Sequence, residues 1–304
     1  MNLADVKRIG VVGAGTMGHG IALNFALAGY PTLISDVSDE FVQDAKARIR
    51  SALDLFVEVG LVTPGRADKA FAQIGGATLE DLAGQCDFIT EAIVDRSSDK
   101  RALFNQLDKL APPQTIFASN TSSLVLSDFG SEVKRQDKIV LTHYFAPPHI
   151  VPGVEVAKGP GTSDETYELT CELMAAARKV PIRLQKERPG YLLNTIQRAL
   201  GQAATDLWAE GMASAEDVEL GIITTFGFRM PHEGPMKHYD LAGLWRWPED
   251  VRGSWASANE QMKQRLAKGK PWFIDPDHFD EALLIRDREY ARRLKALYWP
   301  DTLD

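Results

Sequence analysis

The chain has 304 residues, of which 44% are hydrophobic and 25% charged, a composition typical of a folded protein long enough for two domains. Its 34 Lys and Arg against 42 Asp and Glu give a formal net charge of −8, which argues against a nucleic-acid-binding surface. Cys86 and Cys171 have no metal-ligand spacing, and we expect no metal. No signal peptide and no run of about 18 apolar residues is visible, so we expect a cytoplasmic protein outside membranes.

The first half alternates short β-branched runs with longer helical patterns, which indicates a parallel sheet with crossover helices. The expected strands are Arg8–Gly13, Pro31–Asp36, Asp87–Glu91, Thr115–Ser119, Lys138–His143, Val154–Val156 and Val180–Leu184. The expected helices are Thr16–Ala28, Asp39–Val59, Ser97–Leu110 and one that Thr162 caps and that ends near Ala177.

After Pro189 only helical patterns follow, at Tyr191–Ala209, from Ser214, and at Pro235–Leu244, Trp255–Ala267 and Phe279–Leu297. We therefore predict two domains, an α/β domain over residues 1–188 and an all-α domain over residues 189–304.

A glycine-rich turn follows the first predicted strand. Gly13, Gly15 and Gly18 match G-x-G-x-x-G, with Thr16 and Met17 at the start of the next helix. The three glycines permit a tight turn, close approach of a diphosphate and close helix–strand packing, and the helix N-terminus offers free N–H groups to phosphates. The pattern predicts a dinucleotide-binding domain of the Rossmann type.

An acidic residue, Asp36, ends the second strand 18 residues after Gly18. A carboxylate there accepts both ribose hydroxyls and repels a 2′-phosphate, and Val37 and Ser38 offer no cation to bind one. We therefore expect NAD rather than NADP. The alternative is a turn in which Asp36 only caps the backbone.

Two polar stretches follow later strands, at the edge where open α/β sheets bind ligands. The first is Ala118–Ser123, six small or polar residues at the end of a strand, for which a turn capped by hydroxyls is the alternative. In the second, His143 ends an apolar strand and Glu155 begins the next after a connection with three prolines, which favours a reversal that brings the two together. A histidine held by a carboxylate suits a general base. His149 is the less favoured candidate, and a purely structural histidine remains an alternative.

The chain resembles the L-3-hydroxyacyl-CoA dehydrogenase family, including its lambda-crystallin-type and L-carnitine dehydrogenase relatives, which act on free hydroxy acids. The resemblance runs from Ile9 to about Leu244. Its motifs are Gly13–Gly18, Glu91-Ala92-Ile93, Ser119–Ser123, His143 to Glu155, and Pro189–Asn194. It implies a Rossmann domain followed by a helical domain that carries a homodimer contact.

The resemblance also implies roles for single residues. His143 is the base, Glu155 orients it, and Ser122 and Asn194 bind the reacting oxygen or nearby substrate atoms. On the cofactor side it places Glu91, Asp95, Lys100 and Asn120, with Asp95 where the family usually has Glu.

Two departures from the family concern the motifs themselves. Ala146 replaces the Asn of His-x-x-Asn-Pro, and Thr195 replaces the Arg that usually follows Asn194.

The resemblance implies NAD-dependent oxidation of an L-3-hydroxyacyl substrate such as a 3-hydroxyacyl-CoA, and a free 3-hydroxy acid is the alternative. CoA-using relatives often carry lysines on and after the second helix, whereas residues 53–62 here contain acids and no base. Arg48, Arg50 and Arg66 flank that stretch. Arg229, six residues before Pro235, resembles the arginine of the free-acid relatives and would pair with a carboxylate. The alternative is an arginine of the surface or of a dimer interface.

Two further classes remain as alternatives. One is a crystallin-like structural protein that keeps the fold without turnover, and the Ala146 departure gives it some support. The other is a regulator that senses NAD, which would not need the His143–Glu155 pair.

Overall fold

The computed structural model describes residues 1–248 and 260–299. The chain forms two compact units, unit 1 (Met1–Ala199) and unit 2 (Leu200–Asp304), and each is described by itself. The boundary between the units lies inside helix α8 (Leu193–Ala209), later in the chain than the change in pattern at Pro189.

Unit 1 is built on one eight-stranded sheet in the order β3-β2-β1-β4-β5-β6-β7-β8. The first six strands are parallel, β7 runs antiparallel to β6, and β8 is parallel to β7. This is the predicted Rossmann-type sheet. The strands are β1 (Ile9–Val12), β2 (Thr32–Ser35), β3 (Ile74–Gly76), β4 (Phe88–Glu91), β5 (Ile116–Ser119), β6 (Ile139–Tyr144), β7 (Gly153–Lys158) and β8 (Val180–Leu184).

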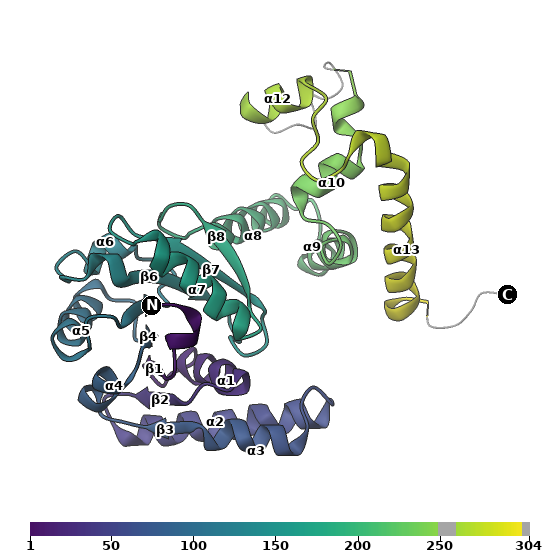
Figure 1. The fold of residues 1–304 in the computed structure, drawn as a ribbon. Helices are drawn as coiled ribbons and strands as arrows, with labels where there is room; N and C mark the ends of the chain where they lie inside the picture. The colour runs from purple at the N-terminus through teal and green to yellow at the C-terminus, as the bar shows by residue number, and fades with distance from the viewer. Residues whose placement is uncertain (249–259, 300–304) are drawn as a thin grey trace. The chain divides into compact units, whose positions relative to one another are not determined.

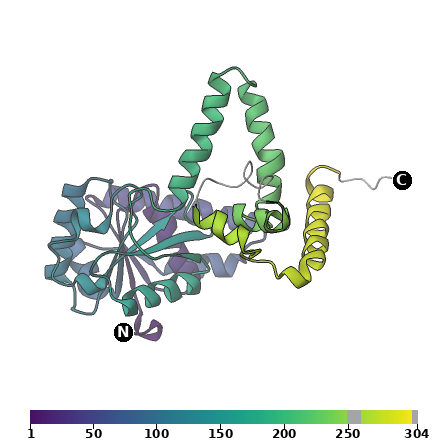
Figure 2. The same cartoon turned by 90° about the horizontal axis from the view of Figure 1, so that it is seen from above.

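Helices cover both faces of this sheet, and the strands lie between them in Figure 2. One apolar core joins the sheet to α1 (Gly18–Ala28), α2 (Asp39–Glu58), α3 (Pro64–Ala72) and α7 (Asp164–Ala176). A second core on the other face joins it to α4 (Leu79–Gln85), α5 (Ser97–Leu110) and α6 (Leu126–Phe129).

The strands could be predicted from the sequence because both of their faces are buried. Phe88 and Val140 belong to the first core, and their neighbours Ile89 and Leu141 to the second. Successive side chains of a strand point to opposite faces, so a sheet covered on both sides needs continuous apolar runs.

The seven predicted strands are confirmed with small shifts at their ends, whereas β3, α3, α4 and α6 were not predicted. The predicted Thr162 cap is wrong by one residue, because Ser163 is the N-cap of α7 and its hydroxyl accepts the Thr166 N–H. The Thr162 hydroxyl donates to the Ile139 carbonyl instead, which ties the turn to the sheet.

Unit 2 is helical in its described residues (Figure 1). After the end of α8 come α9 (Ala215–Ile222) with a π-helical turn (Ile223–Gly227), α10 (Pro235–Leu241), α12 (Glu260–Ala267) and α13 (Phe279–Leu297). The predicted helix Pro235–Leu244 ends three residues early, and residues 255–259 of the predicted helix Trp255–Ala267 lie outside the described residues. Asp240, fully buried, accepts the backbone N–H groups of Trp272 and Phe273 at 2.7 and 2.6 Å and thereby fixes that segment.

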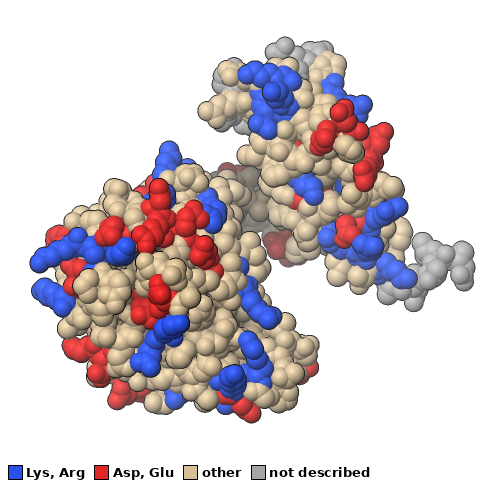
Figure 3. Space-filling model, in the orientation of Figure 1, with Lys and Arg blue, Asp and Glu red and all other residues tan. Residues whose placement is uncertain are grey.

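Acidic and basic side chains lie interspersed on the face of unit 1 drawn in Figure 3. Among the described residues, no helix combines the length and apolar character needed to cross a bilayer.

Candidate active site

The glycine turn after β1 is sterically constrained at two of its three glycines. Gly13 has φ +104°, and a Cβ there would lie 2.7 Å from the backbone of Ala92. A Cβ on Gly18 would lie 1.7 Å from the carbonyl oxygen of Gly13. Both positions therefore exclude any side chain, since the contacts are with backbone that cannot move aside.

Gly15 differs from its two neighbours because a Cβ there would meet nothing within 4 Å. The fold itself does not need glycine at this position. The open side of Gly15, with Thr16 and Met17 leading into the N-terminus of α1, gives room and N–H groups for a diphosphate, so these residues fit a dinucleotide.

Asp36 lies beside this turn, immediately after β2. Its carboxylate accepts the N–H groups of Ala14 at 2.6 Å and of Val37 at 2.7 Å. Arg48 of α2 also reaches the turn and donates to the Ala14 carbonyl at 2.7 Å. Arg48 was expected only as one of the arginines that flank residues 53–62, because a contact between residues 34 positions apart leaves no local signal.

His143 and Glu155 are cross-strand partners in the antiparallel pair β6–β7. Nδ1 of His143 lies 2.7 Å from Oε2 of Glu155, and the two residues are 4% and 0% exposed. Nδ1–H donates a hydrogen bond to the carboxylate, which leaves the lone pair of the neutral imidazole on Nε2. The pair lies near the carboxyl end of β6. Because β1 and β6 run in the same direction, this is the same edge of the sheet as the glycine turn.

The other oxygen of Glu155 is also occupied. Oε1 accepts the backbone N–H groups of Leu192 and Leu193, at 3.0 and 2.8 Å, just where α8 begins. The imidazole of His143 contacts two rings, with centroid distances of 4.5 Å to Phe145 and 5.5 Å to Tyr191. Tyr191 has φ +45°, uncommon for a residue with a side chain, and its hydroxyl donates to the Leu124 carbonyl. The sequence did not predict the contacts of Phe145, Tyr191, Leu192 and Leu193 with the pair, although the last three belong to the family motif Pro189–Asn194.

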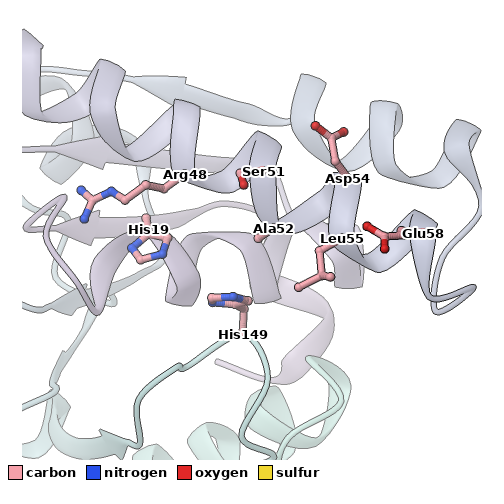
Figure 4. A pocket seen from close by; sticks show the side chains of 8 residues that line it. All are labelled: His19, Arg48, Ser51, Ala52, Asp54, Leu55, Glu58 and His149. Atoms are coloured by element: carbon pink, nitrogen blue, oxygen red, sulfur yellow. The ribbon is translucent and has the colours of Figure 1, made fainter.

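His149, the competing candidate, faces a different place. It lines a cavity of about 620 Å³ together with His19 of α1 and residues of α2 (Figure 4), and its ring centroid lies 5.6 Å from that of His19. Burial, followed by the nearby charges of His19 and Lys179, lowers the pKa of His149.

Ser122 and Asn194 meet at the same edge as His143. The side-chain amide of Asn194 donates to the Ser122 carbonyl at 3.4 Å. Asn120, which follows β5, connects the ends of β5 and β6, because its side-chain oxygen accepts the Tyr144 N–H at 2.9 Å.

Glu91 and Lys100 form a buried ion pair, and the partly exposed Asp95 lies beside it. The ammonium of Lys100, 1% exposed, lies 2.7 and 2.8 Å from the two oxygens of Glu91 and 3.4 Å from Asp95. Glu91 also accepts from the Ser119 hydroxyl. Lys100 is thus enclosed by carboxylates of its own chain.

Arg229 belongs to unit 2, in a cluster of its own. Its Nη1 lies 3.1 Å from Nε2 of His238, and Nδ1 of His238 lies 2.7 Å from the buried carboxylate of Glu233. Since a guanidinium only donates, His238 Nε2 accepts from it, and Nδ1–H donates to Glu233.

The fold and this site define a Rossmann-type dinucleotide-binding protein with a histidine–carboxylate pair at the carboxyl edge of its sheet. A family model described as "3-hydroxyacyl-CoA dehydrogenase, NAD binding domain" matches residues 8–188. The chain belongs to the 3-hydroxyacyl-CoA dehydrogenase family, and NAD is the cofactor of this domain.

Three relatives illustrate the range of the family. The chain is 31% identical to "3-hydroxyadipyl-CoA dehydrogenase" of Escherichia coli over 79% of its own length and spans half of that protein's length. It is 30% identical to "L-carnitine dehydrogenase" of Streptomyces griseus, over 79% of this chain and 70% of that one. The solved structure of (S)-3-hydroxybutyryl-CoA dehydrogenase from Ralstonia eutropha superposes with a TM-score of 0.69 at 29% identity, covering 95% of each chain.

Proposed function

We propose that this protein oxidises the hydroxyl of an L-3-hydroxyacyl substrate to the 3-keto product with NAD, and that His143 is the general base. The observation that carries the proposal is the 2.7 Å contact between His143 Nδ1 and Glu155 Oε2 at the carboxyl edge of the sheet. NAD, when bound, supplies the two-electron acceptor.

His143 removes the hydroxyl proton through Nε2, because Nδ1–H is engaged by Glu155. The carboxylate keeps this tautomer and stabilises the imidazolium that forms. Ser122 and Asn194 hold the reacting oxygen, and each well-placed polar group contributes roughly 2–4 kcal/mol to the barrier reduction. Burial of the His143–Glu155 pair strengthens its electrostatic interaction.

A free 3-hydroxy acid is a second candidate substrate, and the surface of α2 favours it. The cavity in Figure 4 is lined by Arg48 as its one Lys or Arg, against two acids, Asp54 and Glu58. Such a lining repels a polyanionic carrier such as coenzyme A. In unit 2, Arg229 is held by the His238–Glu233 pair and offers a planar guanidinium for a carboxylate.

We also propose a homodimer. Neither α8 nor α9 has a buried residue, and both carry exposed apolar side chains: Ile196, Leu200, Leu207 and Leu220. Exposed apolar side chains on helices without a buried face are typical of interfaces, and a second copy of the chain would cover them. Leu220→Glu should shift the mass in solution from dimer to monomer, whereas Glu216→Gln on the same helix should not. A monomeric wild type contradicts the proposal.

The cytoplasmic location expected from the sequence stays a prediction.

The experiment that tests the function is NADH formation from L-3-hydroxybutyryl-CoA and from a panel of free 3-hydroxy acids. We expect turnover with the thioester. Turnover with free acids alone, abolished by Arg229→Ala, favours the second candidate. Tight NAD binding without NADH formation from any of these substrates contradicts the proposal and favours a structural protein.

A further inference from the structure

The carboxylate of Asp95 is directed at the loop after β5, which carries Ser122. Oδ2 accepts the backbone N–H groups of Ser122 at 3.2 Å and Ser123 at 3.1 Å, and the Ser123 hydroxyl at 2.7 Å. Oδ1 accepts the Thr121 hydroxyl at 2.5 Å. The hydroxyl of Ser122 lies 3.4 Å from Oδ2, at the outer limit of a hydrogen bond. One side chain therefore binds three consecutive residues of the loop.

Asp95 is itself held by an ion pair with Lys100. The Lys100 ammonium, held on two sides by the buried Glu91, lies 3.4 Å from Oδ1 of Asp95. Ser119, which donates to Glu91, accepts the Thr121 N–H at 3.2 Å. The loop is thus linked to the ends of β4 and β5 through two carboxylates and one ammonium ion.

These contacts leave Asp95 little capacity for an outside partner. A carboxylate has about four acceptor sites, and four donors of the loop together with Lys100 already face it. A glutamate at this position would carry its carboxylate about one methylene further, whereas the shorter Asp95 reaches the loop of its own chain.

We propose that Asp95, supported by Lys100, is a positioning residue that fixes Ser122 for the reacting oxygen and is not a cofactor ligand. The inference rests on the proposed function, since Ser122 matters for catalysis only if it meets the substrate. It assigns Asp95 and Lys100 a role different from the cofactor-side one that the family resemblance implies.

The electrostatics of the site agree with this assignment. Burial opposes ionisation of Asp95, but hydrogen bonds from Thr121 and Ser123 and the charge of Lys100 outweigh it, and the pKa of Asp95 falls to about 2. The carboxylate is therefore ionised and accepts from the loop over the whole range in which an enzyme is assayed.

The test compares Asp95→Asn with Ser122→Ala and with the double variant. In Asp95→Asn, an amide NH₂ replaces one acceptor oxygen and opposes the donors of the loop. We expect kcat to fall at least tenfold, the NAD Kd to stay within twofold, and the loss to shrink below twofold in the Ser122→Ala background. Asp99→Asn, a half-buried acid in the first turn of α5 that pairs with Arg96, is the matched control.

A readout independent of turnover separates this inference from the proposed function. Hydrogen exchange of the Ser122 and Ser123 amides should be at least tenfold faster in Asp95→Asn. If that variant does not fold, Ser123→Ala removes one of the donors and should show a smaller increase.

A tenfold rise in the NAD Kd of Asp95→Asn, or unchanged exchange of these amides, overturns the positioning role. These two results hold even if the wild type oxidises none of the substrates, an outcome that contradicts only the proposed function.

Discussion

Oε1 of Glu155 accepts the backbone N–H of Leu193 at 2.8 Å, so the carboxylate that faces His143 also binds the start of helix α8. The two oxygens bind different groups: Oε2 accepts from the imidazole, and Oε1 accepts from the backbone amides of Leu192 and Leu193. The carboxylate orientation is thereby fixed from two sides, and the imidazole that it holds is fixed with it.

Glu155→Gln tests this double role. The glutamine amide has one oxygen and one NH₂, so it must oppose either the imidazole N–H or the two backbone N–H groups. We expect kcat to fall by about 10²–10⁴-fold, by analogy with the loss of the carboxylate in a Ser-His-Asp triad. NAD affinity should be unchanged. Steady-state kinetics with an NAD titration check this, with Glu168→Gln, an exposed partner of Arg183, as the control. Wild-type turnover in Glu155→Gln would show that the carboxylate does not orient the base.

Gly15→Ala separates cofactor binding from folding. The methyl group meets no protein atom within 4 Å, so the free energy of unfolding should change by no more than about 0.5 kcal/mol. The NAD Kd should rise at least tenfold, because the Cβ occupies the space that the diphosphate needs. Denaturation and NAD binding are measured together, and Gly84→Ala, also open around its Cβ but inside helix α4, should leave NAD affinity unchanged. Unaltered NAD affinity in Gly15→Ala would place the diphosphate elsewhere.

Lys100→Met tests the buried ion pair with Glu91. The methionine fills a similar volume but leaves the Glu91 carboxylate without its counter-charge, which destabilises a protein by about 3–5 kcal/mol. Burial already raises the pKa of Glu91 against the opposing effect of Lys100, so the variant should favour the neutral acid. Urea denaturation measures the loss, and Lys109→Met, at an exposed position of the same helix, should cost little. Equal stability of the two variants would mean that the pair contributes nothing.

The His19–His149 contact predicts a pH dependence of stability. Burial is the largest cause that lowers the pKa of both imidazoles in the folded protein. The unfolded chain therefore binds more protons between the two folded-state pKa values and about 6.5, and stability should decrease as the pH falls through that window. His149→Gln should make the curve of unfolding free energy against pH flatter between pH 7 and 5. A variant curve parallel to that of the wild type rules this contribution out.

The sequence predicted the parts of the fold that depend on local pattern. Strands buried on both faces are continuous apolar runs, so most of the sheet could be predicted. The glycine turn and Asp36 could be predicted from their spacing. Strand β3 was missed because Ile74-Gly75-Gly76 is too short and too glycine-rich to show a period. Helix α3 was missed although Thr63 and Pro64 form an N-cap followed by proline at the first turn, a recognisable start.

The contacts inside the candidate site were less accessible. The proline-rich connection suggested that Glu155 returns toward His143, and β6 and β7 pair with the two residues opposite each other. That Leu193 also binds Glu155, or that Asp95 turns to the Ser122 loop, depends on three-dimensional placement of residues 27 to 38 positions apart. Such contacts leave no periodicity or spacing in a single sequence.

The most direct test of the central claim is the rate of NADH formation by His143→Asn, measured with saturating NAD and the best substrate of the panel. Loss of a positioned general base predicts a decrease of kcat by about 10²–10⁴-fold, with the NAD Kd within about twofold of the wild type. A variant that keeps a rate close to that of the wild type would contradict the assignment of His143 as the base.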